Sequence, residues 1–240
     1  MDLKTISQGL RKTLKVKPCG AVIVAAGTAS RMGGIDKVMA PLEGEPMIVR
    51  TVRAFQQSDV ISEIVIVTRP DLLEPIAELC RDMDKVKAVV AGGDSRQASV
   101  SHGLSALSPK MKLVAVQEGA RPLISLALID RTVRAAHTYG AAAPGIPVKD
   151  TVKIVQGGIV DRTPDRTTLR AIQTPQVFDL DLLQGALEKA RADGAEVTDD
   201  CSAVERLGMS VRIVEGDERN MKITTPMDLA VAKLLLEEGK

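Results

Sequence analysis

The chain has 240 residues and a formal net charge of +1, and hydrophobic residues make up 45% of it. These values are typical of a globular protein with one sizeable core. A near-zero charge, with aromatic residues at 1% of the chain, argues against a nucleic-acid-binding surface, which needs a basic patch and often stacking side chains. We therefore expect an aliphatic core, and recognition of any nucleobase through backbone groups.

Short apolar runs alternate with longer amphipathic stretches over the first 148 residues. Strands are predicted at 21–26, 63–68, 86–91, 112–117 and 140–148, and helices at 46–58, 71–83 and 125–140. Pro46 suits the first helical position and Gly140 suits a C-cap. Because the strand candidates are continuously apolar, they should be buried on both faces, as in a parallel sheet covered by helices. The pattern predicts a doubly wound α/β fold with a mostly parallel sheet.

This alternation breaks between 148 and 176. Two short strand-like stretches flank Gln156-Gly157-Gly158 with no helix between them, so we expect a β-arm, at about 148–172, that projects from the sheet. Helices are predicted at 179–193 and 199–207, a strand at 211–215, and a last helix capped by Thr225, with Pro226 next and Asp228 in its first turn. No linker indicates a second domain.

Cysteine spacing and terminal composition indicate a cytoplasmic protein. Cys19, Cys80 and Cys201 are too few and too far apart for a disulfide framework or a zinc site, so we expect reduced, buried thiols. Residues 1–18 carry charges throughout and lack the apolar run of a signal peptide, and no stretch approaches the ~20 apolar residues of a membrane span. We expect no membrane contact.

The first predicted strand is followed by "AAGTASRMGGIDKVMAPL". Its spacing matches neither G-x-G-x-x-G, which disfavours a nicotinamide-dependent dehydrogenase, nor the P-loop motif. Small residues at Ala25, Ala26 and Gly27 permit close backbone approach, and the cations Arg31 and Lys37 would suit a triphosphate. Taken alone, the stretch is equally compatible with a flexible loop and solvated cations.

Two further strands end in polar residues. In "AGGDSRQASV", Gly93 permits close approach of a planar ligand, and Asp94 or the serine after it can cap the helix that carries Ser99. "VAVQEGARP" ends on Glu118 and Arg121, which would suit a solvated turn or a site at the end of a buried strand. Both histidines lie outside these motifs and are interpreted as structural.

The ordered set "AAG…RM…DK", "GGDSRQASV", "GARP", "KDTV", "QTPQVF", "TDD" and "NMKITTP" resembles the 2-C-methyl-D-erythritol 4-phosphate cytidylyltransferase family. The resemblance runs from about residue 20 to 236. It implies a single Rossmann-like nucleotidyltransferase domain over 20–240, preceded by an N-terminal extension at 1–19. It also implies a homodimer in which the β-arm clasps the second subunit.

The resemblance also implies sites for CTP, for the sugar phosphate and for Mg²⁺ or another divalent cation. The residues that match the family's nucleotide contacts are Ala25, Ala26, Gly27, Gly93, Asp94 and Ser99. Arg31, Lys37 and Lys222 match its catalytic cations, and Glu118 matches its metal ligand. The sugar-phosphate contacts match Arg121 and Thr174 and, from the arm of the other subunit, Thr151 and Arg166.

The implied reaction transfers CMP from CTP to 2-C-methyl-D-erythritol 4-phosphate in isoprenoid precursor biosynthesis. The chain departs from the family pattern at several positions: Gln117-Glu118 stands where His-Asp is usual, Asp36 precedes Lys37 where proline is usual, Ala29 and Ser30 replace a common glycine and basic residue, and Arg170 stands where an aromatic is frequent. The alternatives are a cytidylyltransferase for a pentitol phosphate such as ribitol 5-phosphate, and a weakly active CTP-binding regulatory homologue whose Glu118 does not seat the metal.

Overall fold

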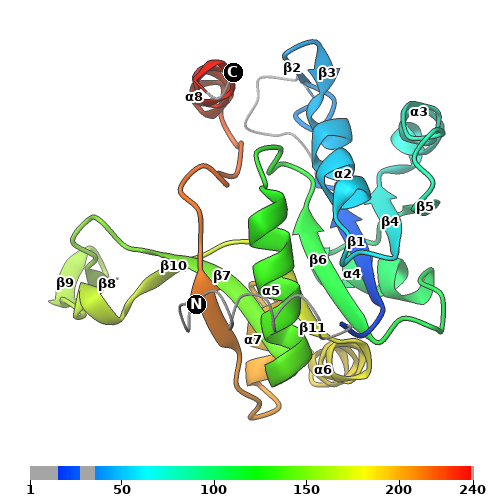
Figure 1. Ribbon diagram of the computed structural model, residues 1–240. Helices are drawn as coiled ribbons and strands as arrows, with labels where there is room; N and C mark the ends of the chain where they lie inside the picture. Colours follow the sequence, from blue (N-terminus) through cyan, green and yellow to red (C-terminus); the bar gives the residue numbers. More distant parts are fainter. Residues whose placement is uncertain (1–15, 28–35, 239–240) are drawn as a thin grey trace, which may run out of the picture.

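A mixed sheet forms the centre of the molecule (Figure 1). The computed structural model describes residues 16–27 and 36–238. Its parallel half contains β1 (Cys19–Val24), β4 (Glu63–Thr68), β5 (Val86–Ala91) and β6 (Leu113–Glu118), in the order β6-β1-β4-β5. These strands were all predicted, and the carboxyl ends of all four meet at one edge of the sheet.

The other half of the sheet differs from the sequence prediction. The strand predicted at 140–148 is β7 (Ala141–Pro147), but it runs antiparallel to β10 (Arg170–Ile172) and β11 (Gln176–Asp179), and β11 runs antiparallel to β6. By contrast, β12 (Arg212–Glu215) pairs with β7 in parallel. The pattern missed β10 and β11 because each has three or four residues, too few for a periodicity to register. The sheet is thus mostly parallel with an antiparallel segment.

Helices cover both faces of the sheet and bury two aliphatic cores (Figure 1). One face packs against α2 (Met47–Gln57), α3 (Leu73–Leu79) and α5 (Leu126–Tyr139). The other packs against α4 (Arg96–Ser105), α6 (Leu180–Ala192) and α7 (Asp200–Glu205). The expected reduced thiols are free and buried. Because both faces are covered, the doubly wound arrangement is confirmed.

Local capping signals set several helix ends. Gly140 ends α5 in the left-handed region, at φ +84°. Thr225 and Asp228 form a capping box around the start of α8 (Pro226–Glu237). Pro46 lies one position earlier than predicted, as the N-cap of α2, and the helix predicted at 71–83 begins as a 3₁₀ turn, Pro70–Leu72. None of the helices in the described ranges is long and apolar enough to cross a membrane.

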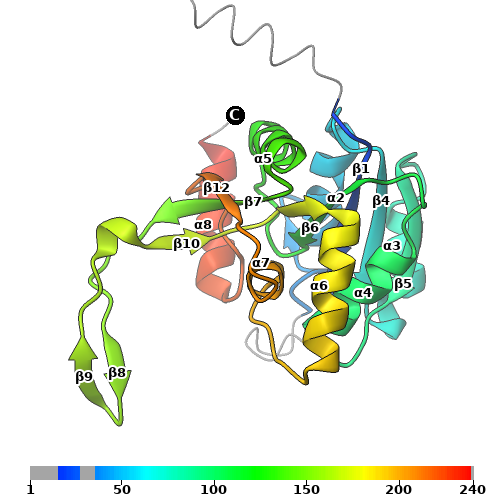
Figure 2. The same ribbon diagram turned by 90° about the horizontal axis from the view of Figure 1, so that it is seen from below.

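The hairpin predicted around Gly157 is present and projects away from the body of the molecule (Figure 2). It consists of β8 (Ile154–Gln156) and β9 (Ile159–Arg162), joined by Gly157 and Gly158 at φ +57° and +81°. A 3₁₀ turn at Arg166–Thr168 leads the chain back to β10 and the main sheet. A second small hairpin, β2 (Pro41–Leu42) with β3 (Glu45–Pro46), packs under α8 through the apolar cluster that contains Leu42, Ile223 and Ala232.

Candidate active site

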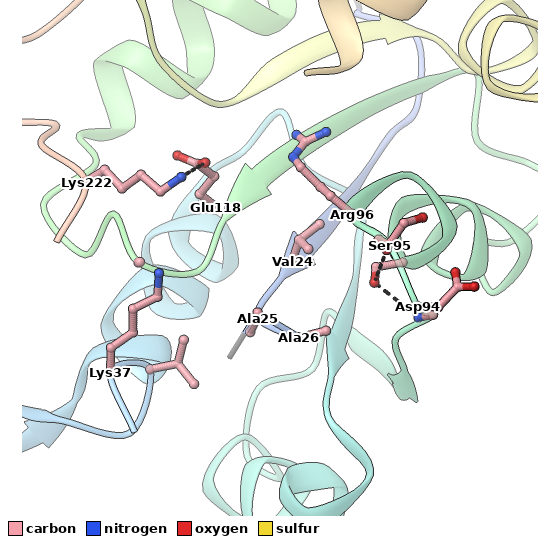
Figure 3. A pocket seen from close by; sticks show the side chains of 14 residues that line it. Val24, Ala25, Ala26, Lys37, Asp94, Ser95, Arg96, Glu118 and Lys222 are labelled. Carbon is pink, nitrogen blue, oxygen red and sulfur yellow. Dashed lines mark hydrogen bonds and ion pairs between the residues drawn. The ribbon is translucent and has the colours of Figure 1, made fainter. Parts of the chain in front are cut away.

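A cavity of about 410 Å³ lies at the edge where β1 and β6 end (Figure 3). Predicted site residues that line it are Ala25, Ala26, Gly27, Lys37, Gly93, Asp94, Ser99, Glu118 and Lys222. In Figure 3, Lys37, Glu118 and Lys222 lie on one side of the turn after β1, and Asp94 and Ser95 lie on the other. Segments about 200 residues apart in the chain thus share one site. Arg31 lies outside the described residues.

The turn after β1 is held tightly against its neighbours. The Ala25 N–H donates to the Val67 carbonyl at 2.7 Å, and the Gly119 N–H donates to the Val24 carbonyl at 2.9 Å. A Cβ on Gly92 would lie 2.5 Å from the Cβ of Ala26, so small residues are required on both sides of this contact. The turn therefore presents backbone to the cavity, which is how a phosphate or nucleobase edge is approached closely.

The opposite wall is the loop before α4. Ser95 caps α4 by accepting the Ala98 N–H, and a Cβ on Gly93 would lie 2.4 Å from the Cβ of Ala98. The Ser99 hydroxyl accepts the Gly93 N–H at 3.1 Å and donates to the Ser95 carbonyl at 2.9 Å. Ser99 therefore fixes the shape of this loop, and the loop backbone with Asp94 faces the ligand space.

Glu118 is held by two cations. Its Oε2 accepts Arg121 Nε at 2.7 Å, and its Oε1 accepts Lys222 Nζ. Burial by itself would raise the pKa of Glu118, but Arg121 and Lys222 outweigh burial, so this pKa lies below its usual value. Glu118 is consequently a fully ionised carboxylate at neutral pH.

Arg121 and Thr174 do not line the cavity; they lie behind Glu118. The Thr174 hydroxyl accepts the Glu118 N–H at 3.1 Å, and Arg121 Nη1 donates to the Asn220 carbonyl at 2.7 Å. Asn220 in turn donates to the Thr174 carbonyl at 2.8 Å, which pins the segment that carries Lys222. These buried groups connect three separate segments and hold Glu118 in place.

The donor set fits a magnesium ion. Mg²⁺ prefers oxygen ligands and commonly takes one or two protein carboxylates, completing its shell with substrate phosphates and water. Glu118 supplies one ionised carboxylate, whereas Asp94 lies on the other side of the turn after β1 (Figure 3). The described residues contain no cluster of three or more histidine, cysteine or acidic side chains, so a protein-only metal cage is not present among them.

Arg96, the first residue of α4, also lines the cavity, and the sequence analysis gave it no role. Its guanidinium makes a bidentate pair with Asp200, at 2.9 and 2.6 Å, and the Asp200 side chain has no exposed area. A cation at the N-terminus of a helix opposes the helix dipole. An arginine at the start of a predicted helix therefore indicates a carboxylate partner elsewhere in the chain, and this was the signal by which the sequence could have revealed the role of Arg96.

Thr151 and Arg166 lie on the exposed arm, which in Figure 2 points away from the body of their own chain. Arg166 donates to the Lys149 carbonyl at 3.0 Å, a contact within the base of the arm. The structure therefore does not bring these two predicted substrate contacts to the cavity of their own subunit.

Comparison with known proteins identifies the family. The model of the family described as 2-C-methyl-D-erythritol 4-phosphate cytidylyltransferase matches residues 19–238. The chain belongs to this family. The cytidylyltransferase of that name from Caldanaerobacter subterraneus is 43% identical over 223 residues, which cover 91% of this chain and 98% of the relative. The one from Symbiobacterium thermophilum is 44% identical over 223 residues, covering 92% and 94%.

Solved structures of the cytidylyltransferase family share the fold. The 4-diphosphocytidyl-2C-methyl-D-erythritol synthase from Anaerococcus prevotii superposes with a TM-score of 0.84 at 34% identity, covering 92% of this chain and 96% of that one. The cytidylyltransferase from Thermus thermophilus gives 0.75 at 34% identity, covering 90% and 98%. The predicted Rossmann-like nucleotidyltransferase fold is therefore confirmed.

Proposed function

We propose that this protein transfers CMP from CTP to 2-C-methyl-D-erythritol 4-phosphate, giving 4-diphosphocytidyl-2-C-methyl-D-erythritol and pyrophosphate for isoprenoid precursor synthesis in the cytoplasm. The observation that carries the proposal is the cavity in which Lys37, Lys222 and Glu118 meet the backbone turn after β1. This arrangement suits a polyphosphate, and membership of the cytidylyltransferase family indicates that the polyphosphate is CTP.

The chemistry requires no general base. A phosphate monoester has a second pKa near 6, so at neutral pH the acceptor is mostly a dianion and already a nucleophile. Among the described residues that line the cavity there is no histidine or cysteine. The acceptor oxygen attacks the α-phosphorus of CTP, a P–O bond forms, and pyrophosphate leaves with the electron pair of the broken P–O bond.

The residues around the cavity lower the barrier through position and charge. Lys37 and Lys222 would hold phosphate oxygens in place and stabilise the charge that grows on them in the transition state. Mg²⁺, when bound at Glu118, supplies further positive charge to the triphosphate. Lys222 would exchange part of its contact with Glu118 for a substrate phosphate. Close contact with the nucleotide would come from Ala25, Ala26, Gly27, Gly93 and Asp94, and Ser99 would hold the loop that carries Gly93 and Asp94.

The sugar-phosphate site would be completed by a second subunit. Thr151 and Arg166 are exposed on the arm, and the hairpin carries apolar side chains in solvent, with Ile159 at 76% exposure and Val155 at 52%. Exposed apolar groups of this kind mark a contact surface. In a homodimer the arm would place these residues at the partner's cavity. Sedimentation of an Ile159→Lys variant, expected to shift toward monomer, tests this arrangement.

Pyrophosphate release tests the reaction itself. The protein is incubated with Mg²⁺, CTP and either methylerythritol phosphate or ribitol 5-phosphate. Release with methylerythritol phosphate alone supports the proposal. Release with ribitol 5-phosphate alone would assign the protein to pentitol phosphates. CTP binding without pyrophosphate release in the presence of either acceptor would indicate a regulatory homologue and would contradict the proposed activity.

A further inference from the structure

The turn that carries Lys37 begins at an aspartate. The Asp36 Oδ1 accepts the Val38 N–H at 3.1 Å, and the Asp36 carbonyl accepts the Met39 N–H at 3.2 Å. Val38 is buried, and its carbonyl accepts the Ile48 N–H from α2 at 2.9 Å. Lys37 is thus fixed between a side-chain cap on one side and a buried anchor on the other, and the cap depends on Asp36.

The second oxygen of Asp36 connects this turn to the sheet. Asp36 Oδ2 accepts Arg69 Nη2, and Arg69 also donates to both oxygens of Asp71, at 3.1 and 3.0 Å. Arg69 directly follows β4, whose Val67 carbonyl holds the turn after β1. The side chains of Asp36 and Arg69 are each 23% exposed, whereas that of Asp71 is 64% exposed. The inner ion pair is therefore the one shielded from solvent.

A carboxylate beside the lysine that faces a triphosphate is unfavourable unless its charge is balanced. Without Arg69, Asp36 would repel the phosphates and attract the Lys37 ammonium, since opposite charges a few ångströms apart pair readily at a partly buried site. With Arg69 in place, the carboxylate keeps its hydrogen bond to the turn while its charge is neutralised. The hydrogen bond from Val38 to Asp36 thus shapes the turn, and Arg69 neutralises the charge of Asp36.

We propose that Asp36 is a positioning residue for Lys37 and that Arg69 is the counter-ion that lets an ionised carboxylate serve there. The inference rests on the proposed CTP site and deepens it. It separates two properties of Asp36: the hydrogen-bond acceptor, which the turn needs, and the negative charge, which the site only tolerates. An asparagine keeps the first and removes the second.

The test is a set of variants measured by calorimetric titration with CTP and Mg²⁺, alongside the thermal midpoint and the separate values of kcat and KM. Asp36→Ala loses the cap, and Arg69→Gln leaves the carboxylate unbalanced, so each should raise the Kd for CTP about tenfold. Asp36→Asn should stay within about threefold of the parent, because it keeps the cap. Arg81→Gln, at an exposed arginine paired with Glu78, is the matched control and should leave the Kd unchanged.

The decisive variant is the double substitution Asp36→Asn with Arg69→Gln. It should bind CTP better than Arg69→Gln alone and return to within about threefold of the parent, because no unbalanced carboxylate remains in the turn that carries Lys37. Asp71 also loses Arg69, but its side chain is 64% exposed, so water screens its charge. A double variant as weak as Arg69→Gln would show that Arg69 acts on the nucleotide or the fold without Asp36, and would overturn the inference. So would an Asp36→Ala protein with the parent's affinity. A parent protein that binds no CTP would instead contradict the proposed function.

Discussion

Substituting Asp200 with asparagine should destabilise the fold by a measurable amount. The Asp200 side chain is fully buried and accepts two hydrogen bonds from Arg96, which joins α7 to the start of α4. Removing one partner of a fully buried ion pair costs about 3–5 kcal/mol. The Arg96 side chain is 31% exposed, and the asparagine oxygen can still accept one bond. We therefore expect a loss of about 2 kcal/mol, which for a chain of this size lowers Tm by about 4–8 °C.

Urea unfolding followed by circular dichroism measures this loss. Asp193→Asn is the matched control, because Asp193 is likewise ion-paired, with Lys189 and Arg206, but lies at the surface. Its unfolding free energy should change by less than about 0.5 kcal/mol. Because Arg96 lines the cavity, Asp200→Asn should also weaken CTP binding, whereas Asp193→Asn should not. If the two variants were equally stable, the buried pair would contribute no more than a surface pair, and the reasoning would be wrong.

Three further outcomes are expected. Lys37→Ala should lower kcat/KM about 100-fold, on the order of 3 kcal/mol of transition-state stabilisation, with an unchanged Tm. Steady-state kinetics on the folded variant measure this loss, and a turnover equal to the parent's would refute the role given to Lys37. Gly103→Ala should cost about 1–3 kcal/mol, because the added Cβ would lie 2.4 Å from Val22 Cγ1 and 2.8 Å from Val67 Cγ2; an unfolding free energy equal to the parent's would contradict this packing. Burial opposes ionisation of Asp228, but hydrogen bonds from Thr224 and Thr225 outweigh burial and lower the pKa of this carboxyl. The stability that the carboxylate adds should therefore be complete above about pH 4 and be lost as the pH falls further. The unfolding free energy of Asp228→Asn should accordingly lie about 1 kcal/mol below that of the parent at pH 7 and converge with it in acid.

Several ends of the secondary-structure elements were readable from the sequence because their causes are local. Gly140, Thr225 and Asp228 act within one helical turn of their own positions, and the continuous apolar runs of β1, β4 and β6 reflect burial on both faces. The same applies to the hairpin turn at Gly157, where only neighbouring residues matter. Motif order also predicted many of the residues that line the cavity, such as Lys37 and Lys222, but it missed Arg96 and did not indicate that Arg121 and Thr174 lie outside the lining.

The pairings that shape the site were decided by the tertiary structure alone. Glu118 meets Lys222, and Arg96 meets Asp200, in each case across 104 positions of the chain. The sequence also did not indicate that Arg121 lies behind Glu118 or that Asp36 is balanced by an arginine after β4. Periodicity and capping report the environment of a residue within its own element. Which charges become partners depends on how distant strand ends converge at one edge of the sheet, and no local pattern encodes that convergence.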